Sequence, residues 1–80
     1  MINEPAEENL VSFFRADYEI VPGPNYGWNF KCSESRHIIK FSADYDAIID
    51  YAKSYCKTHS SNLVIYNYYH EASERISFKE

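Results

Sequence analysis

The 80-residue sequence has few of the features that mark a membrane, secreted or phosphate-binding protein. It contains no run of eighteen apolar residues, so we expect no membrane-spanning helix. Its first nine residues, MINEPAEEN, lack the basic region and the apolar block of a signal peptide, and we therefore expect a cytoplasmic protein. Its only two glycines, Gly23 and Gly27, flank Pro24, Asn25 and Tyr26 and predict a hairpin turn, with no phosphate-binding loop.

Cysteine is equally scarce, and we expect Cys32 and Cys56 to stay reduced in a cytoplasmic chain. Cys56 and His59 are three residues apart, and Cys32, His37 and His70 would have to complete a zinc site. No C-x-x-C or H-x-x-x-H pair is present, and a buried thiol on an apolar face behaves as a small hydrophobic group. Cys56 would also lie near a helix C-terminus, where the dipole opposes a thiolate nucleophile. We expect no metal, no cofactor and no enzyme activity.

Basic charge is in deficit, because 12 acidic residues against 8 basic ones leave a net charge of −4. Non-specific nucleic-acid binding depends on neutralising phosphates, so this balance argues against it. It favours a protein partner whose own surface is basic, such as one that handles nucleic acid. A hydrophobic content of 45% with 18% aromatic residues indicates one folded domain with a small core.

One helix is predicted within residues 41–59, the only segment in which apolar side chains recur at steps of three and four. The apolar positions are Tyr45, Ile48, Ile49, Ala52, Tyr55 and Cys56. Ser42 or Asp44 caps the first turn, and the opposite face carries Asp46 and Asp50. Two carboxylates on one face could serve acid–base chemistry, but a solvated helix face explains them better.

Five strands are predicted from alternating side chains and turn signals. They cover residues 17–22, 26–32, 36–41, 62–69 and 75–79. The first three are joined by short turns and should form an antiparallel meander. The order strand-strand-strand-helix-strand-strand predicts an α+β fold, in which one helix covers one face of an antiparallel sheet.

The chain divides into a domain of residues 17–80 and an extension of residues 1–16. In the extension, Pro5 with Glu7 and Glu8 is typical of a helix start. The apolar cluster Leu10, Val11, Phe13 and Phe14 follows. This segment could dock on the domain as a short helix, join the sheet as an extra strand, or engage a partner.

The domain resembles the small bacterial proteins of domain of unknown function 2188 over residues 18–78. The resemblance is carried by Tyr18-Glu19-Ile20-Val21-Pro22, Trp28, Phe30-Lys31, Phe41, Asp46-Ala47-Ile48, Tyr51-Ala52-Lys53 and Leu63-Val64-Ile65-Tyr66. This chain departs from the pattern at Ala43, where Thr or Ser is usual, at Asp46, where Glu is usual, and in lacking an Asp-Gly turn before the last strand. The resemblance implies the same fold and no activity.

A candidate contact surface consists of Tyr66, Tyr68 and His70, which alternate along the fourth strand. If the helix covers the face of Leu63 and Ile65, these three side chains lie on the open face. With Asp44, Asp46 and Asp50, they form our predicted protein-binding site, since tyrosine is favoured at interfaces. Two alternatives stay open: Tyr66 and Tyr68 pack only within the domain, or they stack single-stranded bases beside Arg36, Lys40, Arg75 and Lys79.

In size and charge, the chain is similar to phage-encoded inhibitors of host defence complexes, including anti-CRISPR-like acidic mimics of nucleic acid. Its acidic set would be Glu4, Glu7, Glu8, Asp44, Asp46 and Asp50. The function expected from the sequence is therefore non-enzymatic protein binding, in the manner of such an inhibitor. An uncharacterised structural domain without a ligand remains an alternative, and an exposed sheet edge would also allow a homodimer.

Overall fold

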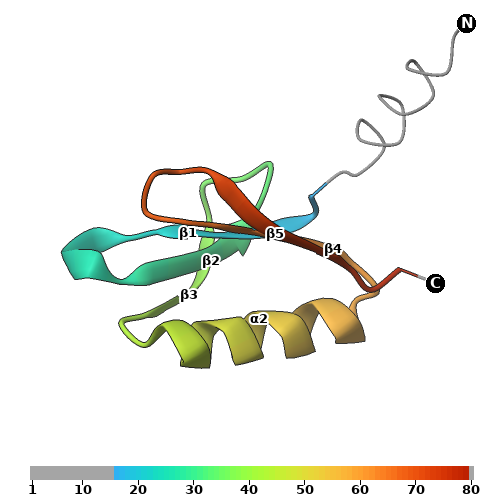
Figure 1. Cartoon of the computed structure of the whole chain (residues 1–80). Coiled ribbons are helices and arrows are strands. Elements are labelled where there is room, and N and C mark those ends of the chain that lie inside the picture. The colour runs from blue at the N-terminus through green and yellow to red at the C-terminus, as the bar shows by residue number, and fades with distance from the viewer. Residues whose placement is uncertain (1–15, 80) are drawn as a thin grey trace, which may run out of the picture.

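The computed structural model describes residues 16–79 and contains one helix on one face of a five-stranded sheet (Figure 1). The elements are β1 (Tyr18–Pro22), the 3-10 turn η1 (Pro24–Tyr26), β2 (Trp28–Cys32), β3 (Ile38–Ser42), α2 (Tyr45–Thr58), β4 (Asn62–Tyr66) and β5 (Ala72–Ser77). The predicted α+β class and element order are confirmed. The predictions made for residues 1–15 lie outside the described residues. None of the described helices has the length and apolar character needed to cross a bilayer.

The strands are arranged in the order β3-β2-β1-β4-β5. β1, β2 and β3 form the predicted antiparallel meander, and β4 and β5 also pair antiparallel. The β1–β4 pair is parallel, with Ile20 opposite Ile65. After β3 the chain crosses over through α2 and enters β4, which lies beside the central strand β1 and runs in the same direction. Parallel strands need a crossover connection of this kind. The sheet is thus mostly antiparallel, with one parallel pair that the strand patterns did not predict.

Helix α2 begins at Tyr45, because Asp44 caps it and the preceding residues belong to β3. Asp44 Oδ1 accepts hydrogen bonds from the backbone N–H groups of Asp46 and Ala47 at 3.0 and 3.3 Å. These two groups lack partners within the helix, so the cap stabilises its first turn. At the other end, the backbone N–H of His59 donates to the Tyr55 carbonyl. The helix therefore begins directly after Asp44, one of the two predicted caps, and ends at Thr58 within the predicted range.

The core lies between α2 and the sheet face that it covers (Figure 1). Its buried members are Ile20, Trp28, Phe30, Ile48, Ala52, Cys56, Leu63 and Ile65. Phe30 is fully buried on β2, and the rings of Tyr51 and Tyr55 contact it edge-on at centroid distances of 5.9 and 5.2 Å. The predicted apolar face of the helix and the Leu63–Ile65 face of β4 therefore meet, as the two periodicities indicated.

In the turn between β1 and β2, Asn25 and Tyr26 adopt left-handed backbone conformations, with φ of 55° and 61°. The neighbouring glycines do not adopt positive φ. A Cβ at Gly27 would overlap the tip of the Phe41 ring, so a larger residue there would require that ring to move. Left-handed backbone is uncommon for non-glycine residues, although asparagine tolerates it better than tyrosine. The intrinsic backbone preference of tyrosine therefore does not account for this conformation at Tyr26, which the surrounding structure must stabilise.

Candidate functional site

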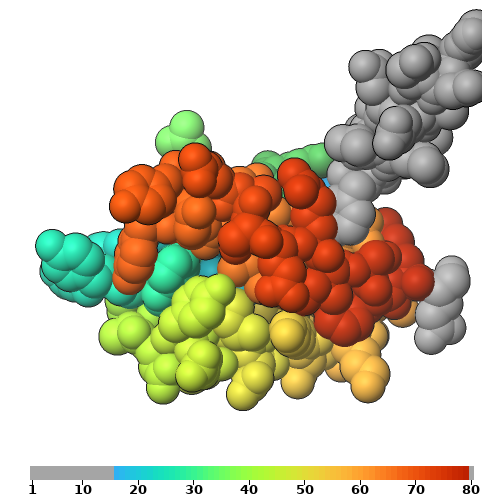
Figure 2. Space-filling view, in the orientation of Figure 1, coloured from blue at the N-terminus to red at the C-terminus, as the bar shows by residue number. Residues whose placement is uncertain are grey.

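An aromatic groove lies at the end of the sheet where α2 begins, and it has a volume of about 470 Å³. The residues that line it are Tyr26, Trp28, Ala43, Tyr45, Asn67, Tyr68 and Ser73. Figure 2 shows the β1–β2 turn, the β4–β5 turn and the start of α2 gathered at this end of the molecule. Four of these seven side chains are aromatic and none carries a charge at neutral pH.

Trp28 forms a fixed base for the aromatic groove, because its buried ring contacts two tyrosines. Its centroid lies 4.9 Å from that of Tyr45 and 4.5 Å from that of Tyr68. The Tyr68 hydroxyl donates a 2.6 Å hydrogen bond to the Tyr26 carbonyl, which joins the β1–β2 and β4–β5 turns. The rim is open to solvent, with exposed fractions of 85% for Tyr26, 52% for Tyr68 and 41% for Tyr45. The groove thus combines a packed base with exposed rings.

Tyr68 reaches the groove because β4 ends at Tyr66, earlier than predicted. Asn67 Oδ1 accepts hydrogen bonds from the backbone N–H groups of Tyr69 and Glu71 at 2.9 and 3.0 Å. A side chain that satisfies its own backbone in this way favours a turn over a strand. The turn includes His70 at φ 63°. In the sequence, the alternation of aromatic residues continues past Asn67, so the pattern alone did not indicate that β4 ends at Tyr66.

The predicted row of Tyr66, Tyr68 and His70 on one sheet face is therefore wrong. Tyr68 packs on Trp28, on the side of the sheet that α2 covers. Tyr66 follows Ile65 in β4 and so projects from the opposite face, where its ring lies 5.5 Å from that of His70. The turn at residues 67–70 thus separates Tyr68 from Tyr66 and His70, whereas Tyr66 and His70 stay together.

Two of the predicted acidic residues lie close to the groove. Asp44 and Asp46 flank Tyr45, and both are exposed, as is Asp50 one turn further along α2. Burial raises the pKa of Tyr45, and the negative charges of Glu74 and Asp46 raise it further. The groove therefore lies in a negative field from α2 and β5. Asp44 caps the helix, and the charges that act on the Tyr45 hydroxyl are those of Glu74 and Asp46.

The basic residues considered for nucleic-acid binding do not gather around the aromatic groove. Lys40 lies over the ring of Tyr51, with its Nζ 5.1 Å from the centroid. Lys79 pairs with Asp17 at 3.3 Å. Arg75 is opposite Val64 in the sheet register and so lies on the face away from the core. None of the seven side chains that line the groove is cationic, whereas binding to a phosphate backbone depends on cationic side chains.

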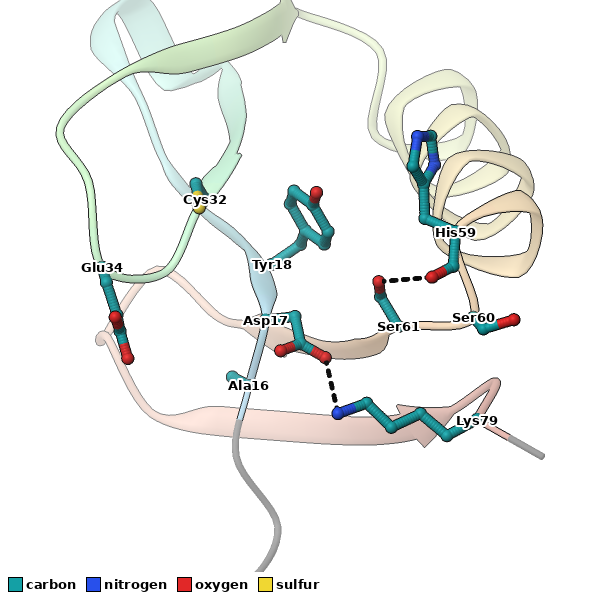
Figure 3. Close-up of a pocket in the computed structure, with 9 residues that line it drawn as sticks. All are labelled: Ala16, Asp17, Tyr18, Cys32, Glu34, His59, Ser60, Ser61 and Lys79. Carbon is teal, nitrogen blue, oxygen red and sulfur yellow. Dashed lines mark hydrogen bonds and ion pairs between the residues drawn. The ribbon is translucent and has the colours of Figure 1, made fainter.

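A second, polar cavity of about 430 Å³ lies at the other end of the sheet (Figure 3). Its lining includes Asp17, Tyr18, Cys32, His59 and Lys79. Asp17 Oδ2 accepts a 2.9 Å hydrogen bond from the Asn62 backbone N–H as well as the Lys79 ion pair. Asp17 therefore serves to tie the start of β4 and the end of the chain to β1, and its carboxylate is not a free catalytic group.

The two thiols are free, and they differ in environment. Cys56 is fully buried in the core, and burial followed by the charge of Asp17 raises its pKa to about 11. A thiol in this state is almost entirely protonated at neutral pH, so it is a poor nucleophile. Cys32 is partly exposed at the polar cavity. No group of three His, Cys, Asp or Glu side chains within residues 16–79 could hold a metal ion.

The folded protein is expected to lose stability between about pH 9 and 12. A hydrogen bond with Tyr55, then burial, raises the pKa of Tyr18 from 10.0 to about 12, and burial raises that of Cys56 from 9.0 to about 11. Because the folded state holds both protons more tightly, this stabilisation is complete below pH 9 and is lost as the pH rises through the folded values. Urea unfolding at pH 8 and 10.5 measures the loss. Tyr18→Phe should lose less than the wild type, and an equal loss would contradict the assignment.

Little in the sequence indicated the aromatic groove. Tyr26 lay in a predicted turn, Trp28 on a predicted core strand and Tyr45 on a predicted core helix, so each had a separate explanation. The useful signal was the density of tyrosine in and beside turns, where aromatic side chains lack cross-strand partners. Comparison of the chain with protein-family models, curated proteins and solved structures found no match. The resemblance to domain of unknown function 2188 therefore stays a prediction.

Proposed function

We propose that this protein is a non-enzymatic module that binds a protein partner through the aromatic groove and the acidic residues beside it. The observation that carries the proposal is the set of exposed rings of Tyr26, Tyr45 and Tyr68 around a groove whose base, Trp28, is held rigidly. Exposed aromatic side chains over a packed base are typical of binding hot spots, because they bury large areas at low conformational cost.

The negative charge of the chain favours a partner protein with a basic surface. The chain carries a net charge of −4, and Asp46 and Glu74 act on the groove itself. A basic surface on the partner would complement this field and speed association. Proteins that handle nucleic acid carry such surfaces, so inhibition of one of them by acidic mimicry is part of the proposal. Single-stranded nucleic acid fits less well, since its phosphates would meet carboxylates at the groove.

Affinity capture with matched tyrosine variants tests the proposal. The wild type, Tyr68→Ala and Tyr69→Ala are immobilised, exposed to a lysate of the encoding cell with and without nuclease, and the retained proteins are identified by mass spectrometry. Tyr69 is the matched control, because it is 84% exposed in the same turn and does not line the groove. We expect a defined protein that survives nuclease, is kept by Tyr69→Ala and is lost by Tyr68→Ala.

Three outcomes would overturn the proposal. Equal capture by Tyr68→Ala and the wild type would remove the groove from the binding surface. Loss of every partner on nuclease treatment would favour direct nucleic-acid binding. Capture of this chain alone would indicate a homodimer. Circular dichroism of each variant separates loss of binding from loss of fold.

A further inference from the structure

The aromatic groove has a chemical character that narrows what it could accept. Its rings present apolar faces, and its lining contains no cationic side chain. Asn67 Oδ1 is occupied by two backbone N–H groups, and the Ser73 hydroxyl donates to the Ile65 carbonyl at 3.1 Å. Asn67 Oδ1, the Ser73 hydroxyl and the Tyr68 hydroxyl are therefore engaged within the protein. The ring faces, the hydroxyls of Tyr26 and Tyr45 and the nearby charges are the features left to recognise a ligand.

The negative field at the groove is not neutralised by the cations whose partners are known. Lys31 pairs with Glu19 at 2.8 Å, Lys79 pairs with Asp17, and Lys40 lies over Tyr51. Arg75 follows Glu74 but projects from the opposite face of β5.

Asp46 and Glu74 do not line the groove, but each is next in sequence to a residue that does, Tyr45 and Ser73, and both charges act on Tyr45. Glu74 is also opposite the core residue Ile65 in the sheet register, which places it on the side of the sheet that α2 covers. A cation in the groove would therefore lie against aromatic faces and within the field of these two carboxylates.

We propose that the aromatic groove binds an arginine side chain of the partner protein, an inference that rests on the proposed function. A guanidinium group is planar and stacks on aromatic faces, and it bonds carboxylates through its edge. The ammonium group of lysine is more strongly hydrated, so entry into an apolar groove costs it more. The groove volume of about 470 Å³ leaves room for a whole side chain above Trp28.

Small arginine analogues test this inference without the partner. Trp28 is the only tryptophan in the chain, so its indole N–H gives a unique nuclear magnetic resonance signal at the base of the groove. N-acetyl-L-arginine amide is titrated into the full ¹⁵N-labelled chain, with N-acetyl-L-citrulline amide as a neutral compound of nearly the same shape. We expect a saturable shift of the Trp28 signal with arginine and at least about fivefold weaker binding of citrulline, because citrulline lacks the cation.

Charge variants complete the test. Asp46→Asn combined with Glu74→Gln should bring arginine binding close to that of citrulline, whereas Glu34→Gln, which removes a charge at the other end of the sheet, should change it little. Equal binding of arginine and citrulline, or no shift at Trp28, would overturn the inference. If capture of a protein still depends on Tyr68 in that case, the proposed function stands and only the arginine assignment fails.

Discussion

Replacing Phe30 with alanine is expected to destabilise the domain by about 3–5 kcal/mol, which is enough to unfold much of the protein at room temperature. Phe30 is fully buried at the centre of β2, between β1 and β3, and the rings of Tyr18, Tyr51 and Tyr55 contact it. Removing its ring leaves a cavity that these side chains fill only in part. A domain of this size has only several kcal/mol of stability in total.

Urea or thermal unfolding followed by circular dichroism measures this effect. Phe41→Ala is the matched control, because Phe41 lies on the neighbouring strand and is 44% exposed. We expect Phe41→Ala to cost less than half as much as Phe30→Ala. Similar unfolding midpoints for the two variants would show that the core does not depend on the β2 face that packs under α2.

Replacing Tyr26 with glycine is expected to change stability and binding in opposite directions. Tyr26 has φ 61° and is 85% exposed, so its backbone is held in a strained conformation and its side chain buries little area. Glycine removes the strain, which we expect to raise the free energy of unfolding by roughly 1 kcal/mol. The same change removes a ring from the rim of the aromatic groove, and we expect partner binding to weaken at least about tenfold.

Two further variants separate the ring from the backbone. Tyr26→Asn keeps a Cβ and tolerates the left-handed region, so it should weaken binding as glycine does. Asn25→Gly changes the adjacent strained residue, which does not line the groove, and should leave binding unchanged. The Tyr68 hydroxyl bonds the backbone carbonyl of residue 26, which all these variants retain. A Tyr26→Gly variant that binds as tightly as the wild type would contradict a role for this ring.

Part of the candidate site was accessible from the sequence. Tyr68, Asp44 and Asp46 were predicted contact residues, and the structure places them at or beside the aromatic groove. Tyr66 and His70 were joined to Tyr68 by assuming one continuous strand, and the Asn67 turn breaks that strand. Glu74 lay between the predicted strands 62–69 and 75–79, although it belongs to β5 and its charge acts on Tyr45.

Elements that depend on neighbours a few residues away could be predicted from the sequence. The helical period of residues 45–56 and the alternation of Leu63 and Ile65 selected the buried faces, because each pattern reflects which side chains share one side of a local structure. The Asp44 cap is equally local, since its partners are the N–H groups of Asp46 and Ala47.

Only the tertiary structure decided the parallel β1–β4 pair and the aromatic groove. The groove joins Tyr26 to Tyr68 across 42 residues, and their contact depends on which strands are neighbours and on how two turns bend. Left-handed backbone at Tyr26 and the hydrogen bonds of Asn67 set those bends. Many arrangements of strands and turns that are distant in the sequence are compatible with the same local periodicities. The packing of the whole chain selects one of these arrangements.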